Sequence, residues 1–301
     1  MGKPLFPIKK IGKRVGLYTI SFVFHKRKKT KGCRFHPSCK TLHNMSIPYY
    51  KQTGQEVEIF EHVYKNKLPL LLKGPTGTGK SRFVEYMAHQ MGKKLYTVAC
   101  HEETSATDLI GRYIIKGAET IWIDGPMTKA VREGALLYLD EVAEARPDVI
   151  VALHSLTDHR RTLFIDKTGE TIEANDSFML IATYNPGYQK GFKELKPSTR
   201  QRFVSFSFNY PKAKVETEIL VNETGVEESI AKKLIKLGEK IRNLTDLGLA
   251  ETVSTRLLVD AAILIKSGLP MRLACNVAIA EPLSDDQDIV DALKDLISIS
   301  I

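Results

Sequence analysis

The chain has 301 residues, enough for one large domain and a small one, and its formal charge of +9 at pH 7 is unevenly distributed. Residues 1–44 contain twelve Lys or Arg and no Asp or Glu. The whole chain has 44 Lys or Arg and 35 Asp or Glu, so positions 45–301 carry 44 − 12 = 32 basic residues against 35 acidic ones. Electrostatic binding of nucleic acid therefore depends on the first 44 residues alone. No apolar run approaches the length of a membrane span, about 18 residues, and Cys100 and Cys275 favour a reduced, cytoplasmic protein without membrane insertion.

The basic segment 1–44 has several interpretations. Its apolar stretch 15–24 is typical of a secretory signal, but no Ala precedes Met45, and the basic run 26–29 stands where a small-residue cleavage site is needed. Four possible zinc ligands, at a spacing that matches no established site, are Cys33, His36, Cys39 and His43. Because the composition changes at Met45, we interpret residues 1–44 as a disordered extension or an upstream translation.

Five apolar segments, separated by helical or irregular stretches, predict the strands of the rest of the chain. They are 70–73, 95–99, 135–139, 178–183 and 203–208. Strands that alternate with helices in this way predict an α/β fold, with a parallel sheet covered by helices on both faces. Two inserts, 112–123 with its turn at 116–119 and 162–172 with its turn at 167–170, predict β-hairpins.

The pattern changes after Pro211, where apolar residues recur at helical spacing through the last third of the chain. We expect a small all-helical region here, with a hinge at 211–214. The sequence 284–287 has capping-box spacing and predicts the start of the last helix. Its inner face would carry Ile289, Leu293 and Leu296.

The segment 74–81 matches the phosphate-binding pattern G-x-x-x-x-G-K-[ST] directly after a predicted strand. Its glycines let backbone N–H groups turn inward around phosphates, Lys80 reaches the β and γ oxygens, and the Ser81 hydroxyl is placed to hold Mg²⁺. The helical spacing of 82–87 aims a helix N-terminus at the same anion, which argues against a chance match in an ordinary loop. We therefore predict a nucleoside triphosphatase whose nucleotide-binding residues are Gly74, Pro75, Thr76, Gly77, Thr78, Gly79, Lys80 and Ser81.

Polar residues follow two of the predicted strands. Asp140 and Glu141 come directly after 135–139, and ligands bind at the C-terminal edge of a parallel sheet. We expect Asp140 to hold Mg²⁺ through water and Glu141 to orient and deprotonate the attacking water; a helix N-cap pair is the alternative. Asn185 follows the strand 178–183 and either contacts the γ-phosphate and the lytic water or forms an ordinary Asn-Pro turn.

Three arginines are further candidates. Arg200 and Arg202 precede the last predicted strand, where an arginine is either part of a surface ion pair or an arginine finger held on a rigid junction. We prefer Arg202 as the finger because it stands directly before Phe203. Arg256 lies in the first turn of a helix that Ser254 opens; the helix dipole disfavours a cation there, so we expect it to contact bound phosphate.

Together these motifs resemble those of an AAA+ ATPase. In this resemblance 74–81 corresponds to Walker A, 139–141 to Walker B, Asn185 to sensor 1, Arg200 and Arg202 to the arginine finger, and 254–256 to sensor 2. The two hairpin inserts resemble those of the MoxR branch. Further segments within residues 47–301 are similar to the CbbQ/NirQ/NorQ subfamily: Tyr49 and Tyr50, 98–101, 108–113, 124–126, 131–134, 184–189 and 195–203.

The resemblance implies an AAA+ α/β nucleotide-binding domain over 45–210, with a five-stranded parallel sheet between helices, and a small all-α lid domain over 211–301. It also implies ATP and Mg²⁺ as cofactors, and a homo-oligomeric ring, a hexamer, in which the finger enters the neighbouring site. CbbQ-like members act on Rubisco with a CbbO partner that contains a von Willebrand factor A domain, while NirQ- and NorQ-like members act with NorD in nitric oxide reductase maturation. Our first interpretation is the motor of a Rubisco activase, cytoplasmic or carboxysome-associated, with nitric oxide reductase as the alternative client.

An alternative from another class is a nucleic-acid-associated AAA+ factor that uses the basic segment for phosphate contacts. Positions 45–301 contain no recognition-helix pattern and no Gly-Ala-Phe-Thr-Gly-Ala loop of the kind that sigma-54 activators carry. We therefore expect no nucleic-acid partner. Client binding would then come from an adaptor or from the hairpin inserts, where Trp122 is either an exposed anchor or part of the core.

Overall fold

The computed structural model describes residues 49–186, 195–244, 249 and 251–301. The chain divides into two compact units, Met1–Asn44 and Met45–Ile301, and all described residues belong to the second. The basic segment 1–44, with its possible zinc ligands, lies outside the described residues. Within the described part, no helix combines the length and the apolar character needed to cross a lipid bilayer.

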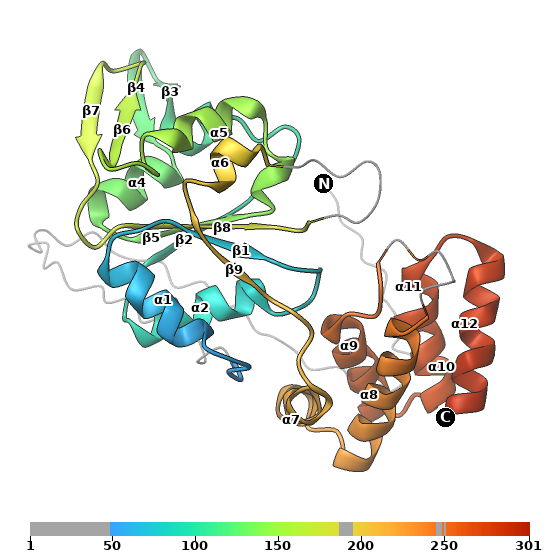
Figure 1. The fold of residues 1–301 in the computed structure, drawn as a ribbon. Helices are drawn as coiled ribbons and strands as arrows, with labels where there is room; N and C mark the ends of the chain where they lie inside the picture. The colour runs from blue at the N-terminus through green and yellow to red at the C-terminus, as the bar shows by residue number, and fades with distance from the viewer. Residues whose placement is uncertain (1–48, 187–194, 245–248, 250) are drawn as a thin grey trace, which may run out of the picture. The chain divides into compact units, whose positions relative to one another are not determined.

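A five-stranded, fully parallel sheet forms the centre of the α/β part, as predicted (Figure 1). Its strands, in spatial order, are β2 (Leu95–Ala99), β5 (Leu136–Asp140), β8 (Met179–Tyr184), β1 (Leu70–Lys73) and β9 (Val204–Ser207). Strand β8 is inserted between β5 and β1, although it follows both in sequence. Its C-terminal end therefore lies between the ends of β1 and β5, where the phosphate-loop motif and the acidic pair begin.

Helices cover both faces of this sheet, and alternating strand residues enter two separate hydrophobic cores. Leu70 and Leu72 pack with the helices α1 (Glu56–Lys65) and α2 (Lys80–Gln90). Leu71 packs in the other cluster. The helices that contribute to this second cluster are α3 (Ala106–Ile110), α4 (Pro126–Glu133) and α5 (Pro147–His154). Burial on both faces explains why the strands form continuous apolar runs in the sequence.

Both predicted hairpins are present, formed by β3 (Gly111–Lys116) with β4 (Glu119–Asp124) and by β6 (Thr162–Ile165) with β7 (Glu170–Glu173). They lie side by side at the top of Figure 1, and the Tyr113 hydroxyl donates to the backbone oxygen of Lys167 across 3.3 Å. Trp122 is half-buried against the core, and its Nε1 donates to Asp124. Of the two alternatives for Trp122, the structure supports the core one; the exposed apolar side chains of β3 and β4 are Tyr113, Ile115 and Ile123.

From Ala213 onward the described residues are mainly helical and bury their own hydrophobic core. The elements are α7 (Ala213–Thr224), α8 (Glu228–Arg242), α9 (Thr255–Lys266), α10 (Met271–Cys275), a π-helical turn η3 (Asn276–Ala280), α11 (Glu281–Leu283) and α12 (Gln287–Ser300). The predicted capping box at Ser284 is wrong, because the N-cap of α12 lies two residues later: it is Asp286, which accepts from the N–H of Asp288. The boundary between domains 45–210 and 211–301, with its hinge at 211–214, stays a prediction.

Candidate active site

The phosphate-loop motif joins β1 to α2 and is held in a conformation that requires glycine. Gly77 has a φ of +71°, in the left-handed region that residues with a Cβ rarely adopt. At Gly74 (φ +148°) an added Cβ would lie 2.2 Å from the backbone oxygen of Phe208, so no side chain fits there. Such a tightly packed loop at a helix N-terminus presents backbone N–H groups to an anion.

Lys80 is buried at the centre of the site and bonds to groups that are far apart in the sequence. Its Nζ donates to the backbone oxygens of Gly74 (2.7 Å) and Pro75 (2.8 Å) and to Oδ1 of Asn185 (2.8 Å). Burial lowers the pKa of Lys80 to about 8, partly opposed by the carboxylates of Asp140 and Glu141. The predicted lysine and the predicted asparagine are thus in direct contact.

Oxygen atoms suited to bind Mg²⁺ lie together at Ser81, the residue after Lys80, and Asp140. The Ser81 hydroxyl lies 3.3 Å from Oδ2 of Asp140 and 2.9 Å from the Tyr138 hydroxyl. Oδ1 of Asp140 accepts from Tyr138 (2.7 Å) and from Thr183 (2.6 Å), so the carboxylate is held in one orientation. Mg²⁺ prefers such oxygens and takes its remaining ligands from water and substrate phosphates. Among the described residues there is no cluster of three or more His, Cys, Asp or Glu that could hold a metal ion.

Glu141 follows β5 in a left-handed conformation with a φ of +52°, unusual for a residue with a side chain. Its N–H donates to the Thr183 hydroxyl (3.0 Å), and its Oε1 lies 3.5 Å from Nδ2 of Asn185. Burial and the neighbouring charge of Asp140 raise the pKa of Glu141, which makes it a better proton acceptor. The N-cap alternative is not supported: Glu141 precedes the short helix η1 (Val142–Glu144), and within the described residues its side chain makes no capping hydrogen bond.

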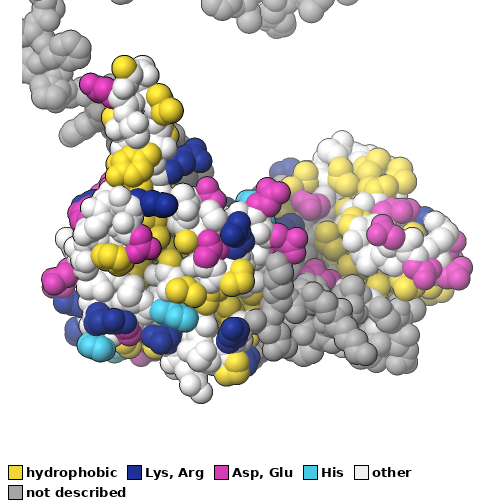
Figure 2. Space-filling model, turned by 90° about the horizontal axis from the view of Figure 1, so that it is seen from above, with side chains coloured by type: hydrophobic (Ala, Val, Ile, Leu, Met, Phe, Trp, Pro, Cys, Tyr) yellow, Lys and Arg dark blue, Asp and Glu magenta, His cyan; other side chains and the backbone are white. Residues whose placement is uncertain are grey.

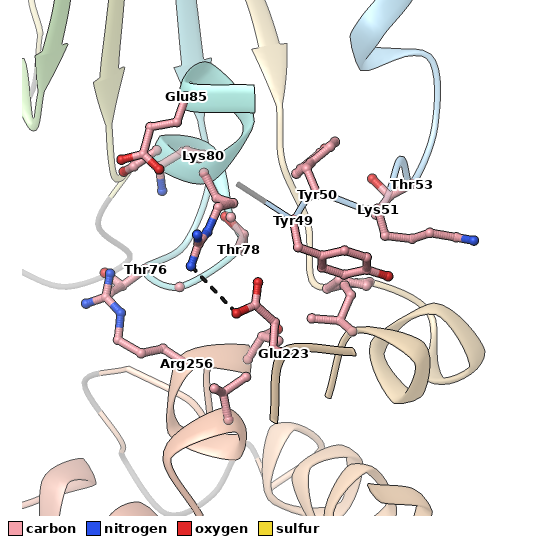
Figure 3. A pocket seen from close by; sticks show the side chains of 18 of the residues that line it. Tyr49, Tyr50, Lys51, Thr53, Thr76, Thr78, Lys80, Glu85, Glu223 and Arg256 are labelled. Atoms are coloured by element: carbon pink, nitrogen blue, oxygen red, sulfur yellow. Dashed lines mark ion pairs between the residues drawn. The ribbon is translucent and has the colours of Figure 1, made fainter. Parts of the chain in front are cut away.

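The three candidate arginines lie in different surroundings. Arg256, at the start of α9, lines the cavity and lies beside Thr76 of the loop in Figure 3. Arg202, after the short helix α6 (Pro197–Arg200), has its Nη1 3.5 Å from the backbone oxygen of His154 and 3.9 Å from Asp158. Among the described residues that line the cavity, neither Arg200 nor Arg202 is present. The structure therefore brings Arg256, but not the two finger candidates, to the pocket of its own chain.

These groups line a cavity of about 390 Å³. Its other walls come from the segment that begins at Tyr49, from α2 and from α7. Across the opening, Arg82 of α2 pairs with Glu223 of α7 at 3.8 Å, the dashed line in Figure 3. Sequence reasoning missed this pair, as well as the hydroxyls of Tyr138 and Thr183. The only signal for those hydroxyls is that they interrupt otherwise apolar strands.

Comparison with known proteins agrees with this geometry. Residues 69–203 match the AAA domain of the dynein-related subfamily, and residues 216–300 match the CbbQ/NirQ/NorQ C-terminal region. The chain belongs to the CbbQ/NirQ/NorQ family of AAA ATPases. This confirms the α/β AAA fold, nucleotide binding and the assignment as an ATPase.

Three relatives with different names within the family are about equally similar to this chain. The chain is 54% identical to the denitrification regulatory protein NirQ of Pseudomonas aeruginosa, over 85% of this chain and 98% of the relative. It is 55% identical to protein NorQ of Paracoccus denitrificans, over 85% and 96%. It is 51% identical to protein CbbQ of Hydrogenophilus thermoluteolus, over 83% and 93%. Because these three sequence identities are so close, they support membership of the family but do not show to which of its branches the chain belongs.

Proposed function

We propose that this AAA ATPase hydrolyses ATP in a ring of identical subunits and uses the free energy to remodel a client protein. The observation that carries the proposal is the convergence of Lys80, Asp140, Glu141 and Asn185 on one cavity, from three different segments of the chain. Each of these side chains is a group that hydrolysis of a phosphoanhydride requires.

The roles follow from the positions of the side chains. Backbone N–H groups of 74–81 and the Nζ of Lys80 bind the phosphates, and Arg256 contributes a further positive charge from α9. Ser81 and Asp140 would hold Mg²⁺, which neutralises charge on the phosphate oxygens when bound. Glu141 takes a proton from the water that attacks the γ-phosphorus, while Asn185 orients that water as the bond to ADP breaks.

In the ring the neighbouring subunit supplies the arginine finger, since neither Arg200 nor Arg202 is among the described residues that line the pocket of their own chain. Arg202, or Arg200 beside it, enters the pocket of the neighbouring subunit and stabilises the charge of the transition state. We infer a hexamer from the family resemblance. In this arrangement nucleotide binding, subunit contact and hydrolysis depend on one another.

The nucleic-acid alternative has little support from the described residues. Positions 45–301 carry a small excess of acidic residues, and the basic segment 1–44 lies outside the described part. On the face seen in Figure 2, basic and acidic side chains are intermixed with hydrophobic ones. A protein that binds nucleic acid through its body usually presents a continuous basic patch.

The client is Rubisco in our first interpretation, reached through a CbbO-type partner with a von Willebrand factor A domain. A second candidate is nitric oxide reductase, matured together with a NorD-type partner. The names of the NirQ and NorQ relatives, which are as similar to this chain as CbbQ is, support this second client. Both candidates use the same motor.

We predict that the protein alone hydrolyses ATP and remodels no client, because no separate recognition domain is evident in the sequence. Together with its co-encoded partner it should restore carboxylation by Rubisco inhibited with a sugar phosphate. The matched control is the same mixture with Glu141→Gln. If inhibited Rubisco stays inactive while assembly of nitric oxide reductase is rescued, the second client replaces the first. If neither client responds, the remodelling proposal is wrong.

A further inference from the structure

A buried ion pair in the helical part has no role in the function proposed above. Glu216 of α7 is fully buried, and only 12% of the Arg242 side chain of α8 is exposed. The guanidinium binds both carboxylate oxygens, Nη1 to Oε2 at 2.8 Å and Nη2 to Oε1 at 2.7 Å. Removing two charges from water costs free energy that their attraction repays only with good geometry and further hydrogen bonds. The further partners of this pair are therefore informative.

On one side the ion pair holds the beginning of α9. Nε of Arg242 donates to the backbone oxygen of Val253 (2.8 Å), and the Thr255 hydroxyl donates to Oε1 of Glu216 (2.6 Å). Thr255 is the first residue of α9 and directly precedes Arg256, whose side chain enters the nucleotide cavity. The Glu216–Arg242 pair thus anchors the residue that directly precedes Arg256.

On the other side the ion pair contacts the phosphate loop through Tyr210. The Tyr210 ring lies 4.3 Å from the Arg242 guanidinium, and its hydroxyl is 3.3 Å from the backbone oxygen of Thr76. Burial raises the pKa of Tyr210 to about 12, so the hydroxyl keeps its proton and donates this hydrogen bond. The Thr76 hydroxyl in turn accepts from Nδ2 of Asn185 at 3.1 Å, which brings the chain of contacts to the site of hydrolysis.

Direct packing joins the same two segments. A Cβ added at Gly77 would lie 2.5 Å from Cβ of Ser254, the N-cap residue of α9. The backbone of the loop at Gly77 is therefore packed directly against the Ser254 side chain, which blocks any movement of one segment toward the other.

We propose that Tyr210, Arg242 and Glu216 form a positioning relay that sets Arg256 relative to the phosphate loop. The relay rests on the proposed function, since the direction of Arg256 matters for activity only if phosphates bind beside it. None of the three relay residues needs to touch the nucleotide. They act through Thr76 at one end and through Thr255 and Arg256 at the other.

The most specific test is Tyr210→Phe, which removes the hydrogen bond to Thr76 and keeps the ring beside Arg242. We expect kcat for ATP to fall about 3- to 10-fold, the contribution of one neutral hydrogen bond, with the affinity for ADP unchanged. Arg242→Lys should cost more, since an ammonium cannot reproduce the two-pronged contact. The control is Tyr64→Phe: the Tyr64 hydroxyl also donates to a backbone oxygen at 3.3 Å, that of Ser177, and Tyr64 does not line the cavity.

A double-mutant cycle separates positioning from general stability. If the relay exists, Tyr210→Phe lowers kcat in the wild-type background but causes little further loss of kcat in the Arg256→Ala background, because both substitutions disable Arg256. Equal kcat for Tyr210→Phe and the wild type would overturn the relay, and so would a loss of full size in the Arg256→Ala background.

Hydrogen exchange decides the relay even if the proposed function fails. Tyr210→Phe should speed amide exchange in both 74–81 and 254–258 of the full chain without nucleotide, whereas Tyr64→Phe should leave both segments unchanged. A wild-type protein without ATPase activity but with this linked exchange would refute hydrolysis and keep the relay. Unchanged exchange in either segment would refute the relay whatever the activity.

Discussion

Arg202→Ala is expected to abolish ATP hydrolysis by the protein on its own, with a loss on the order of 10³–10⁵ in rate, the contribution of an arginine finger. In the structure the Arg202 side chain does not line the cavity of its own chain, and its contacts with the backbone oxygen of His154 (3.5 Å) and with Asp158 (3.9 Å) are long. An exposed pair at that distance contributes about 0–1 kcal/mol to stability, so a large loss of activity with little change in Tm would indicate a catalytic role. Steady-state phosphate release measures the activity, and thermal unfolding measures Tm.

Mixing subunits tests whether this arginine acts on the neighbour. Arg202→Ala subunits should regain part of their activity with Lys80→Ala subunits, because some interfaces then combine an intact phosphate loop with an intact finger. Arg160→Ala is the matched control, since Arg160 binds the same Asp158 at 2.6 Å and should leave hydrolysis near normal. No recovery on mixing, with subunit exchange confirmed, would make Arg202 structural; full loss with Arg200→Ala alone would transfer the role to that residue.

Glu141→Gln should bind ATP with near-normal affinity and hydrolyse it at least about 10²- to 10⁴-fold more slowly, the usual contribution of a positioned general base. The amide keeps the size and the contact with Asn185 but cannot accept the proton of the attacking water. Nucleotide affinity and single-turnover hydrolysis, measured on the same preparation, separate binding from chemistry.

The control for this substitution is Glu133→Gln, the same chemical change at an exposed carboxylate that binds Lys94 and Tyr96. It should leave hydrolysis unchanged. Turnover by Glu141→Gln within a few-fold of the wild type would show that another group activates the water.

The sheet was predictable because its strands are short, buried on both faces and separated by clear breaks. The predicted ranges for β1 and β2 agree with the structure at both ends. The range 135–139 is off by one at both ends, because β5 begins at Leu136 and still includes Asp140, which pairs with Ala99; β8 and β9 also differ from their predicted ranges by one residue at each end. The last helix was harder: Ser284 and Asp286 are both good capping residues, and only the observed backbone shows that Asp286 takes the N-cap position.

The candidate site was predictable where it depends on sequence motifs next to strand ends. Lys80 and Asn185 are 105 positions apart and in contact, because the parallel strands that precede their loops end at the same edge of the sheet. Tyr138 and Thr183 could not be assigned from sequence, since hydroxyls within apolar strands usually belong to the core. Tyr138 reaches Asp140 within β5 itself, whereas the bond from Thr183 depends on β8 lying next to β5, which the order of the strands in the chain does not reveal.

Phosphate release from Mg²⁺-ATP by the purified protein, compared with Lys80→Ala, tests the motor assignment most directly. Nζ of Lys80 makes three hydrogen bonds at the centre of the site, and alanine would remove the charge that binds the phosphates. We predict Mg²⁺-dependent hydrolysis by the wild type, and neither nucleotide binding nor hydrolysis by Lys80→Ala. Hydrolysis by Lys80→Ala at the wild-type rate, or a folded wild type that binds no nucleotide, would contradict an ATP-driven motor at this cavity.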